Sequence, residues 1–214
     1  MEKRAYEIGA YRYKNVDGLE TFYNKIVKYL IFGNVLKNNT YPLSVSAERI
    51  IQAVEIVSYA KSINAKYIAH GSTGAGNDQV RFDMIFQILA PEIEIISLIR
   101  DQNLTRESEI KYLNSHGINI SWEKAKYSIN TGLWGISIGG AETLNSRDPL
   151  PESAYPSKVI KSESEELQIE FKTVELCAIN GKKGKPFELI QRLQILARDF
   201  GIGRDIHIGD TIIG

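Results

Sequence analysis

A glycine-rich loop at residues 70–76 has the residue types of a ligand-binding site. A short apolar segment, Tyr67–Ala69, leads into Gly71, Gly74 and Gly76. A polar cluster and then an apolar pattern with helical spacing follow, comprising Asn77, Asp78, Gln79 and Arg81, then Val80, Ile85, Ile88 and Leu89. Glycine lets a ligand approach backbone N–H groups closely, and the first turn of a helix presents unpaired N–H donors to an anion. We therefore expect the strand–loop–helix arrangement that binds ligands at the carboxyl ends of a parallel sheet.

The side chains after the loop suit an α-amino acid, which carries an ammonium and a carboxylate. Asp78 can bind the ammonium, and Arg81 can hold the carboxylate with two parallel hydrogen bonds. Asn77 and Arg81 are one turn apart and share a helix face, while Thr73 and loop N–H groups suit a second carboxylate. A simpler interpretation stays open, because Asn77 or Asp78 could merely cap the helix while Arg81 pairs with a surface acid.

The elements that position this loop follow from apolar spacing and from capping residues. Before the loop we expect a helix at Met1–Ile8 stopped by Gly9, a strand at Ala10–Lys14, a helix opened by Asp17 and Glu20, and a helix capped by Ser46 that runs to about Ile63. The helix opened by Asp17 and Glu20 has a buried stripe made of Leu19, Phe22, Tyr23, Ile26, Val27 and Leu30. The strand Tyr67–Ala69 and the helix after the loop come next, followed by a strand at Ile93–Ile99 and a helix capped by Thr105 and ended by Gly117. Strands that alternate with helices imply parallel crossovers. Because the chain begins inside a helix and offers few strands, we expect an incomplete parallel-sheet nucleotide-binding domain at 1–121.

The pattern changes after about Ser121. Three short alternating segments indicate antiparallel strands of a meander: Lys158–Lys161, Glu166–Phe171 and Val174–Ile179. Residues Gly181–Lys185 indicate a turn. Pro186 suits the first turn of a helix that runs through Asp199 and ends at Gly201. We expect this second, α+β region to occupy 122–214.

The composition is that of an ordinary globular chain of 214 residues, 43% of them hydrophobic. Lys and Arg total 26, as do Asp and Glu, so no net field favours nucleic acid or an anionic membrane. The single cysteine, Cys177, precludes an internal disulfide and fits a reducing cytoplasm. The three histidines, His70, His116 and His207, lack metal-ligand spacing, so we expect structural roles for them and no metal site.

The segment His70–Phe82 resembles the aspartate- and citrulline-binding segment of argininosuccinate synthase. The resemblance extends through Tyr41–Arg49, Tyr127–Ser137 and Gly201–Arg204, so it covers most of the chain. It implies an adenine nucleotide alpha hydrolase-like domain followed by a synthetase region. It also implies aspartate contacts from Thr73, Asn77 and Asp78; citrulline contacts from Tyr41, Ser46, Asn77, Arg81, Ser128 and Ser137; and nucleotide contacts from Ala69, His70, Gly71, Ser72, Thr73, Gly74, Ala75 and Gly76.

The resemblance implies a ligase of arginine biosynthesis and the urea cycle. In this family the ureido oxygen of citrulline attacks the α-phosphorus of ATP and expels pyrophosphate. The amine of aspartate then displaces AMP from citrullyl-adenylate, which gives argininosuccinate. The implied partners are citrulline, aspartate and ATP with Mg²⁺. The full-length family protein is expected to be a cytoplasmic homo-oligomer, with no catalytic side chain, nucleic acid or membrane implied.

Several family features are missing or changed. A Ser-Gly-Gly-Leu-Asp-Thr-Ser pyrophosphate loop occurs nowhere in the sequence, so the β- and γ-phosphates lack their nest of N–H groups. Val45 replaces a frequent threonine, and Gly209 stands where a glutamate is common, with Asp210 as its possible substitute. A tyrosine contact and the oligomerisation helix would lie past Gly214. We therefore expect little ligase activity from this polypeptide by itself.

Two alternatives come from the same residues. The chain could be a non-catalytic amino-acid-binding or interaction fragment that keeps Asn77, Asp78 and Arg81 for ligand recognition. A transfer-RNA-modifying enzyme of the same nucleotide-binding superfamily fits less well, since it too needs the phosphate loop. Lys182, Lys183 and Lys185 indicate a solvated turn rather than a basic RNA-binding patch.

Overall fold

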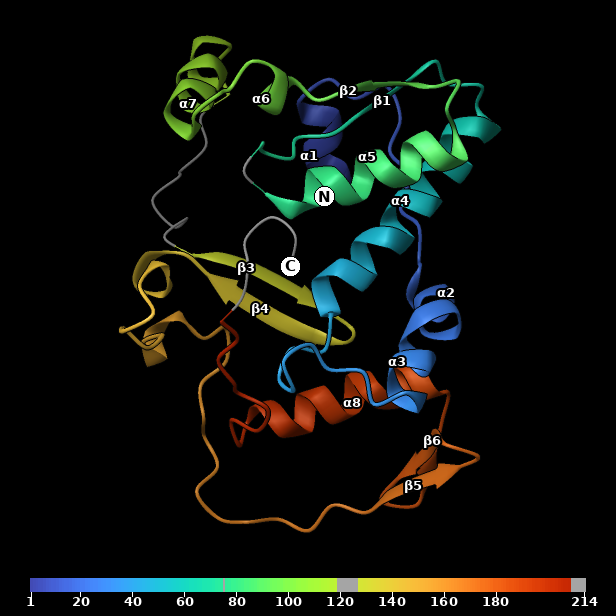
Figure 1. Cartoon of the computed structure of the whole chain (residues 1–214), viewed down its shortest axis with the longest axis vertical. Helices are drawn as coiled ribbons and strands as arrows, with labels where there is room; N and C mark the ends of the chain where they lie inside the picture. The colour runs from blue at the N-terminus through green and yellow to red at the C-terminus, as the bar shows by residue number, and fades with distance from the viewer. Residues whose placement is uncertain (75, 119–126, 209–214) are drawn as a thin grey trace. The chain divides into compact units, whose positions relative to one another are not determined.

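The computed structural model describes residues 1–74, 76–118 and 127–208 of the chain. These residues form two compact units. Their helices and strands are labelled in Figure 1. Unit 1 contains Met1–Gly18 and the described part of Arg49–Lys124, and unit 2 contains Leu19–Glu48 and the described part of Ala125–Asp210. The predicted domain boundary at 121/122 lies outside the described residues. None of the helices in the described ranges is both long and apolar enough to cross a bilayer.

Unit 1 consists of helices around two short parallel strands. Its helices are α1 (Glu2–Glu7), the part of α4 (Ser44–Ser62) from Arg49 onward, α5 (Asn77–Leu89), α6 (Leu98–Asp101) and α7 (Arg106–Ser115), and its strands are β1 (Tyr67–Ala69) and β2 (Glu94–Ile96). Strands β1 and β2 pair in parallel, with Ile68 opposite Ile95. The predicted strand, loop, helix and second strand are therefore confirmed in this order.

Two strand predictions in unit 1 are corrected. Residues 10–14 form no strand, because alternation alone does not supply a neighbouring strand to pair with. The strand predicted at Ile93–Ile99 stops at Ile96, and the buried Ser97 donates its hydroxyl to Asp101 at 2.8 Å at the start of α6. In contrast, the predicted cap of α7 is confirmed, since Thr105 Oγ1 accepts the N–H of Ser108 at 3.2 Å.

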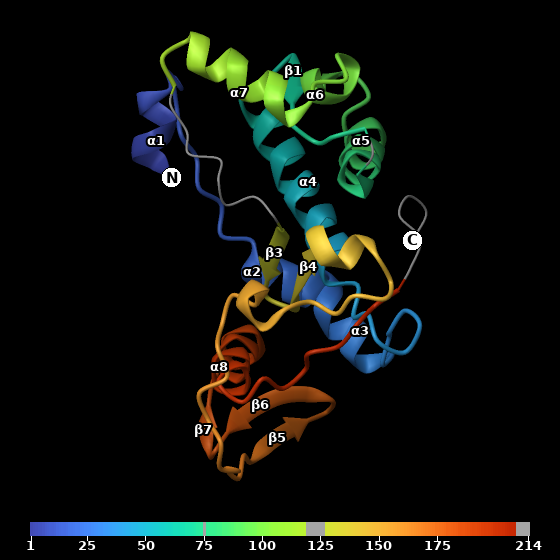
Figure 2. The same cartoon turned by 90° about the vertical axis from the view of Figure 1, so that its left-hand side faces the viewer.

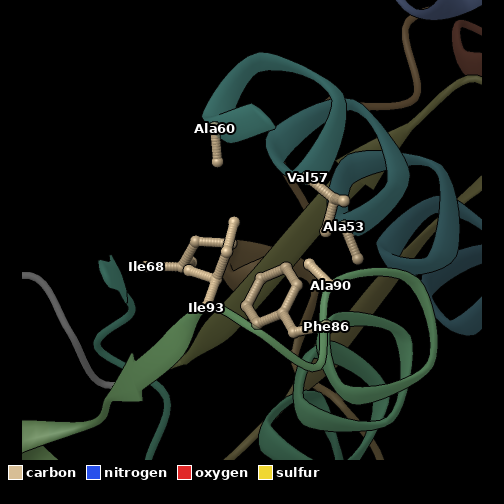
Figure 3. Packing of buried hydrophobic residues seen from close by; sticks show 7 residues of the cluster. All are labelled: Ala53, Val57, Ala60, Ile68, Phe86, Ala90 and Ile93. Atoms are coloured by element: carbon tan, nitrogen blue, oxygen red, sulfur yellow. The ribbon is translucent and has the colours of Figure 1, made fainter. Parts of the chain in front are cut away.

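Small and medium apolar side chains form the core of unit 1 (Figure 3). They come from one face of α4, from β1, from α5 and from the segment before β2: Ala53, Val57, Ala60, Ile68, Phe86, Ala90 and Ile93. Phe82 and Ile85 pack against this cluster. By contrast, Val80 and Ile88, which belong to the predicted apolar pattern of α5, are exposed. The pattern identified the helix but not its whole buried face.

Unit 2 combines an N-terminal helical segment with two antiparallel sheets. Its elements are α2 (Leu19–Phe22), a π-helical turn (Tyr23–Val27), α3 (Lys28–Phe32), the first turn of α4, β3 (Ser128–Gly132), β4 (Gly135–Gly139), 3₁₀ turns at Ala141–Leu144 and Glu152–Ala154, β5 (Ile169–Lys172), β6 (Glu175–Ile179), β7 (Lys182–Lys183) and α8 (Pro186–Arg198). The predicted helix after Asp17 is confirmed, and Phe22, Tyr23 and Val27 of its stripe are buried.

The C-terminal part of unit 2 is a meander β5–β6–β7 with α8 beside it (Figure 2). Pro186 is the first residue of α8 as predicted, and Gly201 follows the helix with a φ of +67°. Residues 158–161 form no strand, contrary to prediction. The predicted turn at Gly181–Lys185 is also displaced, because Asn180 and Gly181 make the tight turn with φ values of +49° and +69° and Lys182–Lys183 already pairs with β6.

Candidate functional site

The glycine loop joins the end of β1 to the start of α5. Gly76 is the N-cap of α5, with φ −93° and ψ 152°, and no side chain caps the helix. The Gly76 N–H donates to the Thr73 carbonyl at 3.2 Å, which closes a turn just before the helix. Because no side chain fills the cap, the N–H groups of the first turn can receive an anionic ligand.

Asn77 is the first residue of α5 and not its cap. Its side-chain Oδ1 is buried and has no hydrogen-bond partner among the described residues. Such an atom loses hydrogen bonds to water without regaining them in the protein, so a partner from a ligand would be favourable. The simpler interpretation, in which Asn77 or Asp78 caps the helix, does not match this geometry, because Gly76 holds that position.

Asp78 lies between two arginines of unit 1. Its Oδ2 accepts from Arg49 Nε at 3.0 Å, and its Oδ1 accepts from Arg81 Nη1 at 3.0 Å. Arg49 also donates to Gln52 at 3.0 Å. The alternative in which Arg81 pairs with an acid therefore holds in part, since one of its guanidinium nitrogens binds Asp78. The other guanidinium nitrogens leave donors for a carboxylate.

A second polar group, which the sequence reasoning did not assign, supports the loop from α5 and α6. Arg100 donates to Asp83 and, at 3.3 Å, to Oε1 of Gln79. The Gln79 amide in turn donates to the Gly74 carbonyl. Gln79 and Asp83 could have been recognised in the sequence as neighbours on one helix face, because they are one helical turn apart. Arg100 follows the neighbouring parallel strand, and the carboxyl ends of such strands share an edge.

His70 belongs to the same group of hydrogen-bonded side chains. The Ser72 N–H donates to His70 Nδ1 at 3.2 Å, so Nε2 carries the proton and donates to Asp83 Oδ1 at 2.9 Å. Hydrogen bonds to Asp83 and then to Asp101 raise the pKa of Arg100 above its usual value. The Ser97 hydroxyl and then Arg100 lower the pKa of Asp101. Arg100 and Asp101 therefore keep their charges at neutral pH.

Strands β3 and β4 form a hairpin that the sequence analysis missed. Two residues, Leu133 and Trp134, connect the strands, and the alternating isoleucines on either side were the available signal. Ser137 lies opposite Asn130, and Ser128 lies opposite Gly139. Directly opposite residues point to the same face. The register therefore brings both predicted serines, with Asn130, to one face of the hairpin.

The first turn of α4 covers the glycine end of this hairpin face. A Cβ added to Gly135 would lie 3.3 Å from Cβ of Ser44, and one added to Gly132 would overlap the Glu48 carboxylate. Ser46, which was predicted to cap α4, lies inside the helix, and its hydroxyl donates to the Leu43 carbonyl at 3.1 Å. The helix begins two residues earlier, at Ser44.

Tyr41 precedes α4 in unit 2. Its hydroxyl accepts the N–H of Val45 at 3.3 Å, and its ring stacks on His207 with 4.9 Å between centroids. The predicted residues divide between the units as follows: Ala69–Gly74, Gly76, Asn77, Asp78 and Arg81 in unit 1, and Tyr41, Ser46, Ser128 and Ser137 in unit 2. Ala75 and Asp210 lie outside the described residues.

Comparison with known proteins identifies the class and then the family. A family model described as the arginosuccinate synthase N-terminal HUP domain matches residues 1–119, which defines a nucleotide-binding α/β fold. The chain is 39% identical over 215 residues to the argininosuccinate synthase of Sulfurisphaera tokodaii, 40% over 217 residues to that of Methanocaldococcus jannaschii and 36% over 219 residues to that of Lactococcus lactis. Each alignment covers 100% of this chain but 55% of the relative. The chain belongs to the argininosuccinate synthase family and spans about half the length of the curated relatives it matches.

Proposed function

We propose that this chain is a portion of a ligase of arginine biosynthesis that condenses citrulline with aspartate at the expense of ATP. The observation that carries the proposal is the uncapped start of α5, where the buried Asn77 Oδ1 has no partner among the described residues. Membership of the argininosuccinate synthase family supports the substrate assignment. The fold and the family membership support the proposal, which concerns the substrates and the reaction.

In unit 1 the loop from Ala69 to Gly76 would lie against the nucleotide. Aspartate would contact Thr73, Asn77 and Asp78. Both oxygens of Asp78 already accept from an arginine, but a carboxylate has about four acceptor sites, so an ammonium can be added. Arg81 keeps donors for a substrate carboxylate, and the resemblance assigns it, with Asn77, to citrulline.

In unit 2 the hairpin face would hold the α-carboxylate and α-ammonium of citrulline. Its hydroxyls come from Ser128, which is exposed, and Ser137, which is half-buried. The resemblance adds Tyr41 and Ser46. In this arrangement Tyr41 is held by its own contacts to Val45 and His207.

The proposed chemistry is positioning and charge stabilisation. The ureido oxygen of citrulline forms a bond to the α-phosphorus, and the bond to pyrophosphate breaks. The aspartate amine then bonds to the activated carbon, AMP leaves, and the amine loses its proton. Among the described residues no three His, Cys, Asp or Glu side chains are placed to hold a metal ion. The Mg²⁺ expected with ATP would be held mainly by the phosphates of ATP, and we assign it no step.

The test is to mix the chain with a polypeptide that carries the Ser-Gly-Gly-Leu-Asp-Thr-Ser loop and to measure AMP formation from citrulline, aspartate and ATP. We expect low activity from the chain alone and a clear increase in the mixture, since the added loop binds the β- and γ-phosphates. The Asn77→Ala chain in the same mixture is the control and should lose most of the increase. Association without AMP formation, accompanied by binding of both amino acids, would favour the non-catalytic binding protein instead.

A further inference from the structure

The first turn of α4 places one carboxylate on the hairpin face that carries the predicted citrulline serines. We propose that Glu48 is the charge partner of the substrate's α-ammonium on this face, a role not assigned to it by the sequence analysis. This inference rests on the proposed function, because it takes citrulline as the occupant of the hairpin face. All the residues that carry it lie in unit 2.

The glycine pair at the end of the hairpin makes room for Glu48. Gly132 lies opposite Gly135. A Cβ added at Gly132 would lie 3.0 Å from Cδ of Glu48 and overlap Oε2. The carboxylate therefore occupies the volume in which any other residue would place its side chain. Ser44, one helical turn earlier, approaches Gly135 in the same way.

The hairpin register sets the order in which Gly132, next to Glu48, and the two serines follow one another along the face. Gly132 and Asn130 lie on one face of β3, about 7 Å apart along the strand, and Ser137 is directly opposite Asn130. Ser128 is two residues further along the same face. An ammonium between Glu48 and Ser137 would thus leave the substrate's carboxylate pointing toward Ser128, with both groups of the α-amino acid near hydrogen-bonding partners.

A carboxylate adds to this face what serine hydroxyls cannot supply. Hydroxyls can accept from an ammonium, but a carboxylate also brings a full negative charge that attracts the ammonium directly. Glu48 is half-buried, so water screens the interaction less than at an exposed site. Glu48 would therefore make binding depend on the α-amino group, and the face would discriminate against a compound that lacks it.

The experiment is calorimetry of the full chain with citrulline and with 5-ureidopentanoate, which lacks the α-amino group. The unchanged chain should bind citrulline more tightly. Glu48→Gln should weaken citrulline binding roughly tenfold to a hundredfold, the range for losing a hydrogen bond to a charged group, and leave 5-ureidopentanoate unchanged. Glu55→Gln, on the same helix in unit 1, is the matched control and should keep the preference.

A second experiment uses one variant that displaces the Glu48 carboxylate without removing it, together with a control variant that does not. Gly132→Ala places a methyl group where the flexible Glu48 carboxylate lies, whereas Gly139→Ala, on the same face, meets nothing within 4 Å. We expect Gly132→Ala to reduce the preference for citrulline and Gly139→Ala to retain it. Circular dichroism of each variant would verify the fold.

Two results would overturn the inference while leaving the proposed function intact. One is equal affinity of the unchanged chain for citrulline and 5-ureidopentanoate. The other is a preference for citrulline that survives in Glu48→Gln. If the unchanged chain binds neither compound under any condition that includes ATP and aspartate, the proposed function itself is contradicted and the role of Glu48 falls with it.

Discussion

Arg100 ties the glycine loop to the helix that follows it. Its guanidinium holds Asp83 and Gln79, and Gln79 holds the Gly74 carbonyl. An added Cβ at Gly74 would contact Cγ of Arg100 at 3.5 Å, so the arginine stem also lies against the loop backbone. The proposed binding of phosphates by N–H groups of this loop would gain from such support, because preorganised donors need no rearrangement.

Replacing Arg100 by methionine should loosen the loop. Asp83 would keep His70 as a partner, but Gln79 would lose the contact that orients its amide. We expect the backbone amides of residues 71–74 and 76 to exchange hydrogen about tenfold faster, the equivalent of one ordinary hydrogen bond. Hydrogen exchange measured by mass spectrometry on a peptide spanning the loop tests this. Arg12→Met, at an exposed position of unit 1, should exchange like the unchanged chain.

Tyr23 gives the stability a dependence on alkaline pH. Its side chain is 2% exposed and donates to Glu175 Oε1 at 3.1 Å. Burial, and then this hydrogen bond to an acid, raise the pKa of Tyr23 to about 12. Above a pH of about 10, an unfolded tyrosine releases its proton while the folded Tyr23 keeps it. Rising pH therefore favours unfolding between about 10 and 12.

The variant Tyr23→Phe should reduce this pH dependence. It should lower the unfolding free energy by about 1 kcal/mol at neutral pH, where a hydrogen bond is lost. Between pH ~10 and ~12 its unfolding free energy should fall by about 2 kcal/mol less than that of the unchanged chain. Urea unfolding at several pH values measures both effects, with Tyr11→Phe, at a 95% exposed position, as the control. Parallel curves for Tyr23→Phe and the unchanged chain would show that the tyrosine does not titrate differently on folding.

At the level of elements, local signals predicted helices better than strands. Thr105 and Pro186 mark helix starts in the structure as they did in the sequence, because caps depend on a few neighbouring atoms. A strand needs a partner that the local sequence does not contain. Residues 10–14 and 158–161 alternate but are not part of any strand in the described part of the chain, whereas β3 and β4 pair despite being missed.

The turn after α8 allows a test that separates backbone strain from crowding. Gly201 and Gly181 both have a positive φ, +67° and +69°. An added Cβ at Gly201 would lie 2.8 Å from Cγ2 of Val159, whereas one at Gly181 meets nothing within 4 Å. Gly181→Ala should lower the unfolding free energy by about 1 kcal/mol through strain alone, and Gly201→Ala by about 2–4 kcal/mol because overpacking adds to it. If urea unfolding gives the same loss of unfolding free energy for both variants, the Val159 side chain moves away from the added methyl group at no cost, and the crowding contribution is contradicted.

For the molecule as a whole, residue types predicted the local structure of the glycine loop well, but they did not predict which distant residues contact it. The run from Tyr67 to Arg81 contains its own strand, glycines and helix start, so its local structure could be inferred directly. The contacts of Arg49 and Arg100 with that run depend on tertiary packing that the sequence does not display. The shared face of Ser128 and Ser137 likewise follows from the hairpin register, which sequence spacing alone did not fix.

The ligand-binding claim follows from these arrangements within each unit. The uncapped α5 start lies in unit 1, and the serine face of the hairpin lies in unit 2. The chain spans 55% of the length of its argininosuccinate synthase relatives, so their complete activity is a proposal for this polypeptide. Occupancy of the loop by substrate is the claim on which the other assignments depend.

The most direct measurement is a crystal structure of the chain soaked with aspartate, citrulline and ATP. The account predicts aspartate within hydrogen-bond distance of Asn77 Oδ1, phosphate oxygens at the N–H groups that begin α5, and Arg81 turned partly from Asp78 toward a substrate carboxylate. An empty loop, with Asp78 still bound only by Arg49 and Arg81 and Asn77 Oδ1 still without a ligand, would contradict it.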